Sequence, residues 1–212
     1  MRARLLDAAE ELFAERGYHG AGIRDITQLA GTRVAAVSDY FGGKENLFRE
    51  VLLRRLDPIN EDRRARLAAL PRSGSRAHRL RALVRAFAGP LLVRSGESEG
   101  WRNYLRFTAQ LAHARLPVQL LVAEEFNAIA AEFIERLRAL FPAASEAALH
   151  DAYLLMVAST LQTFADVPRI DSITQGRLRS DAFAQRYASL VPFVEGGITR
   201  LATDPGQAGG TP

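Results

Sequence analysis

Apolar residues recur at intervals of three and four along almost the whole chain, whereas no stretch alternates apolar and polar residues with a period of two. The first spacing places apolar side chains on one face of a helix, and the second would be needed for a half-buried strand. The chain has 212 residues, of which 48% are hydrophobic and 25% charged, which is enough to build a sizeable core. The sequence therefore predicts an all-α protein.

Composition excludes several kinds of site. The chain contains no cysteine, so disulfides, thiolate metal sites and cysteine nucleophiles are absent from it. Asp7, Glu10 and Glu11 interrupt the region where a secretory signal would need an apolar run, and nowhere do about eighteen apolar residues follow one another. We therefore expect a cytoplasmic protein that does not associate with a membrane.

Three short helices are expected at the start of the chain. The first should end at Gly17 and bury an apolar stripe made of Leu5, Ala8, Ala9, Leu12 and Phe13. The second should bury Ile23, Ile26, Leu29 and Ala30. A turn at Gly31 leads to the third, which Gly42 and Gly43 should end. Its inward residues should be Val34, Val37 and Phe41, which leaves Arg33, Ala35, Ala36, Ser38, Asp39 and Tyr40 wholly or partly outward.

Two helices joined by a short turn that contains glycine can place the second helix in the major groove of DNA. The third predicted helix suits this role, since small side chains would let its backbone approach the bases while Arg33 and Tyr40 reach further. The same pattern is also typical of an ordinary packing unit of three helices. The periodicity alone leaves both interpretations open.

The sequence pattern predicts longer helices in the rest of the chain. One should run from Lys44 towards Leu70 with a kink at Pro58, and a second should end near Leu92. After a break at 94–100, helices are expected from Trp101 to about His113 and from Pro117 to near Phe141. A helix over 145–165 is apolar almost all round, a loop covers 166–177, and a last helix carries Phe183, Tyr187, Leu190, Val191, Val194, Ile198 and Leu201 on one stripe.

The stretch LLDAAEELFAERGYHGAGIRDITQLAGTRVAAVSDYFGGKENLFREVL resembles the N-terminal domain of the TetR family of transcription regulators. The blocks that carry the resemblance are AAEELFAERGY, RDIT with the LAG turn, and DYFGGKENLF. It implies a helix-turn-helix DNA-binding domain at 1–46, a ligand-binding and dimerisation domain at 47–202, and a flexible tail at 203–212. It also implies a homodimer that binds operator DNA, usually as a repressor, with the last two helices forming a four-helix bundle between the two copies.

The resemblance also places the DNA contacts. They fall on Arg24, Thr32, Arg33, Val34, Ala35, Ser38, Tyr40 and Lys44. Lys44 is the only lysine among 28 basic residues, and its ammonium would meet a phosphate beside a helix N-terminus.

This chain departs from the family pattern at the DNA-binding helices. Ala21 and Gly22 replace the usual Thr or Ser at the start of the second helix, although Gly22 can still begin it. Asp39 would repel phosphates unless it accepts from a cytosine amine or orients an arginine. Residues 1–56 hold nine basic and eight acidic side chains, so affinity for DNA must depend on the placement of a few charges and on two copies acting together.

A ligand pocket is expected between the helix that starts at Trp101 and the two helices that follow. Its predicted contacts are Trp101, Tyr104, Arg106, Phe107, Gln110, Phe126, Tyr153 and Phe164, with His113 as a further polar anchor and Phe133 and Met156 as further apolar lining. Each of these residues also fits an ordinary core position. The run LLRRLDPINEDRRARLAAL, taken with the SDYFGGKE segment, resembles a subgroup associated with fatty-acid metabolism, which implies a small apolar, acyl-like effector.

The sequence also bears on two functions other than that of a ligand-responsive regulator. An enzyme is disfavoured because the four histidines are scattered, the inward Glu-x-x-His pairs of a di-iron bundle are missing, and no GxSxG, phosphate-loop or HExxH motif occurs. We therefore expect no catalysis, no cofactor and no metal. A dimeric DNA-binding regulator that is controlled by a protein partner, or that has no effector, stays open as the alternative.

Overall fold

The computed structural model describes residues 1–112 and 123–203. Within these residues all regular structure is helical and no strand occurs, so the all-α prediction is confirmed. The helices are α1 (Arg2–Gly20), α2 (Ile23–Leu29), α3 (Ala35–Phe41), α4 (Lys44–Ala68), α5 (Arg76–Ser95), α6 (Glu99–Ala112), α8 (Ala123–Leu140), α9 (Glu146–Phe164), α10 (Arg169–Ile173) and α11 (Phe183–Thr203).

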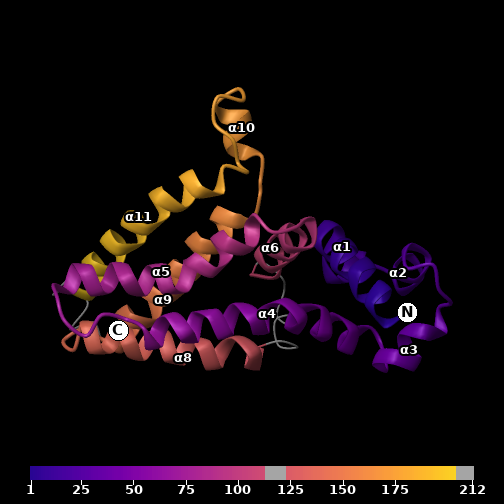
Figure 1. The fold of residues 1–212 in the computed structure, drawn as a ribbon, viewed down its shortest axis with the longest axis horizontal. Coiled ribbons are helices and arrows are strands. Elements are labelled where there is room, and N and C mark those ends of the chain that lie inside the picture. Colours follow the sequence, from indigo (N-terminus) through magenta and orange to yellow (C-terminus); the bar gives the residue numbers. More distant parts are fainter. Residues whose placement is uncertain (113–122, 204–212) are drawn as a thin grey trace, which may run out of the picture.

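The helices form a small group and a larger one, joined by α4. Figure 1 shows α1, α2 and α3 gathered at one end of the molecule, while α4 runs from that end along its length. The larger group holds α5, α6, α8, α9 and α11, and α6 packs against α1. The short helix α10 protrudes from this body between α9 and α11 (Figure 1). The N-terminal helices therefore contact the rest of the protein through both α4 and α6.

The glycines end the first and third helices where the sequence predicts. Gly17 has a φ of 66° and a ψ of 178°, so α1 leaves helical geometry there before one further turn reaches Gly20. Gly42, with a φ of 74°, is the left-handed residue that ends α3. Glycine is favoured at both positions because a Cβ would be strained at these values of φ.

Three predicted orientations in α2 and α3 are wrong. Leu29 is 49% exposed, whereas Thr27 is buried in its place and donates its hydroxyl to the carbonyls of Ile23 and Arg24. Val34 is exposed and Ala36 is buried, the reverse of the prediction. Val34 is the N-cap of α3 and so stands outside the helical repeat, which leaves the inward face to begin at Ala36.

The second half of the chain differs from the prediction mainly at its connections. The loop expected over 166–177 contains the short helix α10. The break predicted over 94–100 is shorter, because α6 already begins at Glu99. The helix α4 continues through Pro58 to Ala68. The end predicted at His113, the start predicted at Pro117 and residues 204–212 of the predicted tail lie outside the described residues.

A buried carboxylate joins the N-terminal helices to α4. The Glu10 side chain on α1 is 3% exposed and accepts from Arg54 at 2.6 Å and from Arg55 at 3.0 Å, both on α4. Arg54 also donates to Asp7 at 2.6 Å, and the Arg55 guanidinium lies over the Trp101 ring of α6 at 4.7 Å. The cluster therefore holds α1, α4 and α6 together where the two groups of helices meet.

Replacement of Glu10 by glutamine should destabilise the protein. Glu10→Gln leaves two partly buried guanidiniums side by side without their shared counter-charge, so the free energy of unfolding should fall by about 3 kcal/mol. Glu11→Gln, at the exposed neighbouring position, should change it by less than about 0.5 kcal/mol. Urea denaturation of both variants tests this, and equal effects would contradict a structural role for the Glu10 cluster.

Candidate nucleic-acid interface and ligand cavity

A tight turn connects α2 to α3. Gly31 takes a left-handed φ of 61°, and the backbone N–H of Thr32 donates to the carbonyl of Thr27 at 2.9 Å. The turn brings residues 32–34 to the surface immediately before α3 begins at Ala35. Two short helices at consecutive positions, the second with an outward face of small and long side chains, can enter a major groove.

The predicted DNA contacts lie on these elements and differ in exposure. Six are exposed and two, Thr32 and Lys44, are half-buried; the exposed ones are Arg24, Arg33, Val34, Ala35, Ser38 and Tyr40. Gly22 is the N-cap of α2 without any side-chain cap. The structure thus leaves most of the predicted contacts accessible to a partner.

Arg33 and Asp39 form a salt bridge across the candidate interface. The Arg33 guanidinium donates to the Asp39 carboxylate at 2.8 Å, and the Arg33 side chain is 77% exposed. Of the two roles that would let Asp39 face DNA, this geometry matches the one in which it orients an arginine. The pair also reduces the net positive charge that α3 presents.

Lys44 is held against the end of α1. Its Nζ donates to the carbonyl of Tyr18 at 2.5 Å and lies 4.5 Å from the centre of the Tyr18 ring. Burial lowers the pKa of the Lys44 ammonium from its ordinary value. Lys44 therefore has a structural role at the junction of α1 and α4, and a contact with phosphate stays a prediction.

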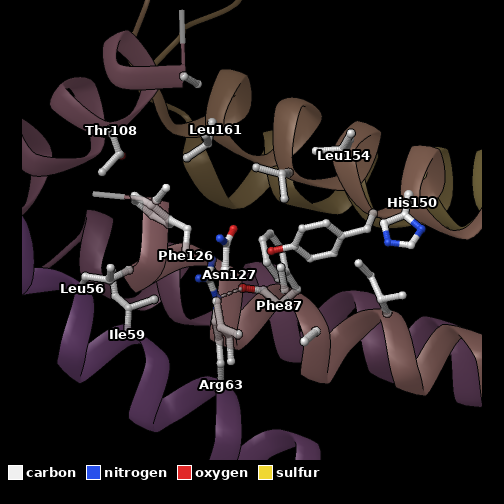
Figure 2. Close-up of a pocket in the computed structure, with 18 of the residues that line it drawn as sticks. Leu56, Ile59, Arg63, Phe87, Thr108, Phe126, Asn127, His150, Leu154 and Leu161 are labelled. Atoms are coloured by element: carbon white, nitrogen blue, oxygen red, sulfur yellow. Dashed lines mark hydrogen bonds between the residues drawn. The ribbon is translucent and has the colours of Figure 1, made fainter. Parts of the chain in front are cut away.

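A cavity of about 790 Å³ lies among α4, α5, α6, α8 and α9. Most of its lining is apolar, and Figure 2 shows Leu56 and Ile59 of α4 on one side and Leu154 and Leu161 of α9 on the other. The volume lies within the range of roughly 300–1,000 Å³ that is usual for small-molecule sites. The helix that begins beside α3 thus also lines this chamber.

Three of the eight predicted ligand contacts line the cavity, namely Tyr104, Phe126 and Tyr153. The other five lie elsewhere. Trp101 packs beneath the guanidiniums of Arg55 and Arg94, and Phe164 packs against Phe183 with ring centres 5.7 Å apart.

The remaining three lie on faces of α6 that point away from the cavity. Phe107 packs against Phe13 and Phe48, and Gln110 donates to the carbonyl of Ala14. Arg106 donates to the side chain of Asn103. The physical reason is that α1 covers one side of α6, so only part of the aromatic set faces the chamber. Phe133 and Met156 are buried in the core outside the cavity lining, and His113 lies outside the described residues.

Sequence reasoning missed Arg63, which lines the cavity from α4. Arg63 is only 6% exposed, and it donates from Nε to the carbonyl of Phe87 at 3.1 Å and from Nη1 to Asn60 Oδ1 at 3.2 Å. Its guanidinium carbon lies 4.0 Å from the centre of the Phe87 ring. The available signal was its phase, because Arg63 continues the apolar stripe of Leu56 and Ile59 at helical spacing.

No helix formed by residues 1–112 and 123–203 is long and apolar enough to cross a membrane. In the same residues, no three His, Asp or Glu side chains lie close enough together to hold a metal ion.

Two family models match the chain. Residues 5–51 match the model described as bacterial regulatory proteins, tetR family, and residues 85–197 match the one described as tetracyclin repressor-like, C-terminal domain. The first match contains α2 and α3, and the second contains the helices α6, α8 and α9 that contribute to the cavity.

Curated relatives match in part of their length. The chain is 38% identical over 86 residues to the HTH-type transcriptional activator FasR of Mycolicibacterium smegmatis, a match that covers 41% of this chain and 38% of that protein. It is 37% identical over 65 residues to the repressor AcnR of Corynebacterium glutamicum, with 29% and 35% covered. It is 32% identical over 112 residues to the regulator BetI of Escherichia coli, with 53% and 55% covered. The chain thus spans 35% to 55% of the length of these relatives.

Solved structures match over nearly the whole chain. FadR from Bacillus subtilis in complex with stearoyl-CoA has a TM-score of 0.56 and 15% identity, covering 96% of this chain and 98% of that one. GusR from Salmonella enterica has a TM-score of 0.60 and 18% identity, with 93% and 95% covered. The fatty acid degradation regulator FadR from Bacillus halodurans has a TM-score of 0.59 and 16% identity, with 96% and 95% covered. At these identities the similarity is one of fold.

Lys44→Met should weaken the junction of α1 and α4. The variant loses the hydrogen bond to the Tyr18 carbonyl and the contact of the ammonium with the Tyr18 ring, so the free energy of unfolding should fall by about 1 kcal/mol. Lys44→Arg keeps a charged donor and should lose less. Thermal unfolding measures both, and a Lys44→Met variant as stable as the unaltered protein would refute the structural role.

Proposed function

Because the chain belongs to the TetR family of transcriptional regulators, we propose that it is a repressor that binds operator DNA as a homodimer and is released by a small ligand. The observation that carries the proposal is the course of α4. This helix begins at Lys44, directly after the candidate reading helix α3, and it lines the cavity with Leu56 and Ile59. One helix therefore connects the candidate reading helix to the cavity. The proposal also implies a cytoplasmic protein, because its target would be chromosomal DNA.

In the proposed complex α3 enters the major groove. Ala35 and Ser38 are small enough to let the helix backbone come close, while Arg33 and Tyr40 can reach base edges or phosphates. The N-terminus of α2 lacks a side-chain cap, so its backbone N–H groups are available to a phosphate. These features support DNA binding through the eight residues that the sequence predicts.

The proposed dimer forms through α9 and α11, which pack against each other within one subunit. Each presents apolar surface to solvent, since Leu155 on α9 is 56% exposed and Phe193 on α11 is 71% exposed. Next to Phe193, a Cβ added at Gly196 or Gly197 would meet no atom within 4 Å. A helix face with small residues around one aromatic side chain suits close packing against the same face of a second copy.

A ligand in the cavity would act through α4. Pro58 lies between the cavity-lining residues Leu56 and Ile59, and it cannot donate a backbone hydrogen bond to the carbonyl of Arg54. This is the place where α4 can change direction at least cost. The two reading helices must sit about 34 Å apart to enter successive major grooves, so a small tilt of α4 in each subunit lowers the affinity for DNA.

The cavity favours a small-molecule effector over a protein partner. A regulator that is controlled only by a protein bound to its surface does not require an apolar cavity of about 790 Å³. Two relatives of similar fold are named as fatty-acid regulators or contain stearoyl-CoA, which supports an acyl-like ligand here. Within the described residues, the lining offers no grouped nucleophile and base that would indicate catalysis.

Arg33→Ala should weaken binding to the operator. We expect the unaltered protein to shift a DNA fragment from upstream of its own coding region, and Arg33→Ala to bind it about ten-fold or more weakly because a base or phosphate contact is lost. Arg136→Ala removes an exposed arginine from α8 and should leave binding unchanged. Gel-shift titration measures all three. Equal binding by Arg33→Ala would place the reading surface elsewhere, and failure of the unaltered protein to bind any such fragment would overturn the proposal.

Phe193→Glu should separate the subunits. A carboxylate at this exposed position would have to be buried between two copies, so the dimer should dissociate into folded monomers at micromolar concentration. Val93→Glu introduces the same charge at an exposed apolar position on α5 and should remain dimeric. Sedimentation velocity distinguishes the two masses. A dimeric Phe193→Glu variant would mean that α11 does not form the interface.

A further inference from the structure

A single buried cation faces the cavity. Arg63 is 6% exposed, and burial lowers the pKa of its guanidinium to about 10, which still leaves it charged at neutral pH. Among the carboxylates whose side chains the structure describes, none forms an ion pair with it, and the titratable groups that act on it are the phenols of Tyr153 and Tyr104. A buried charge without a counter-charge is unfavourable, so a ligand that supplies one gains free energy on binding.

The Arg63 guanidinium also has N–H groups that donate no hydrogen bond to the described residues. It carries five N–H groups, and its hydrogen bonds use Nε and one N–H of Nη1. Among the described residues, Nη2 meets no acceptor. Figure 2 shows the Arg63 side chain directed from α4 into the cavity, with Phe87 beside it. A planar guanidinium with free donors matches the two oxygens of a carboxylate.

Two phenols accompany Arg63 in the lining. Tyr104 and Tyr153 are both nearly buried, and neither hydroxyl donates a hydrogen bond to any residue that the structure describes. Burial raises the pKa of both phenols, so they stay neutral and able to donate. All three residues line the same cavity, and the charge of Arg63 acts on both phenols.

The other acidic and basic lining residues are not buried as Arg63 is. Glu135, Arg138, Glu146 and His150 are exposed, and Arg138 lies 3.6 Å from Glu135. The interior otherwise consists almost entirely of apolar side chains. A ligand with several charges would therefore exceed what one buried cation neutralises, and an uncharged lipid would leave that cation unpaired.

We propose that the ligand of this cavity is an apolar monocarboxylic acid whose carboxylate binds Arg63, with Tyr104 and Tyr153 as further donors and the apolar lining around its tail. This inference rests on the proposed function, in which the cavity holds the effector. It goes further by assigning the chemical class of the head group and its place deep in the cavity.

Calorimetric titration of the full chain with decanoate and with 1-decanol tests the inference. The two probes share the tail and differ in the head group, so the unaltered protein should bind decanoate about 30-fold more tightly. Arg63→Met should remove this preference by weakening decanoate binding while leaving 1-decanol binding within about two-fold. The matched control is Arg64→Met, at the next position of α4, because Arg64 is exposed and pairs with Glu132 at 2.8 Å. Arg64→Met should retain the preference.

The outcomes separate this inference from the proposed function. Equal binding of acid and alcohol by the unaltered protein overturns the role of Arg63 and leaves a ligand-responsive regulator in place. If neither probe binds while the same sample shifts operator DNA, the carboxylic-acid assignment is overturned and the DNA-binding function stands. The comparison of the two probes needs no substitution, so it tests the preference for a carboxylate even if Arg63→Met does not fold.

Discussion

The position of the N-terminal helices depends on the contact between Glu10 and the two arginines of α4. A carboxylate that is almost fully buried must be paired, and here Arg54 and Arg55 supply the pairing from one helix turn. Because Arg55 also lies over Trp101, the same contact reaches α6. The candidate reading helix α3 and the cavity are thereby parts of one connected arrangement, in which α4 cannot tilt without disturbing the ionic contact at its centre.

Much of the fold could be predicted because it follows from local rules. Helical periodicity gave the class, and the glycines that require left-handed backbone marked the breaks at Gly17 and Gly42. The N-terminal motif placed the turn before α3 and most of its exposed side chains. Errors arose at the ends of short helices, where Val34 stands outside the repeat and Thr27 takes the buried place expected for Leu29. Two turns of helix contain too few residues to fix the phase.

The cavity was harder to predict because helix phase alone cannot tell which neighbour covers which face. The sequence groups the aromatic residues of α6, yet α1 covers the side that holds Phe107, and only Tyr104 turns to the chamber. Arg63 was hidden for a different reason, since it is one of 27 arginines in a chain where most are exposed. Its burial depends on α5 and the cavity beside it, which no local pattern describes.

The salt bridge between Arg33 and Asp39 has a consequence for how such a protein would search a chromosome. An arginine that already has an internal partner attracts arbitrary phosphates weakly, and it gains only where a base offers a better acceptor than the carboxylate. In the proposed complex, residence on random DNA sequence would then be brief. Selectivity in that complex would come from the competing Asp39 carboxylate on α3.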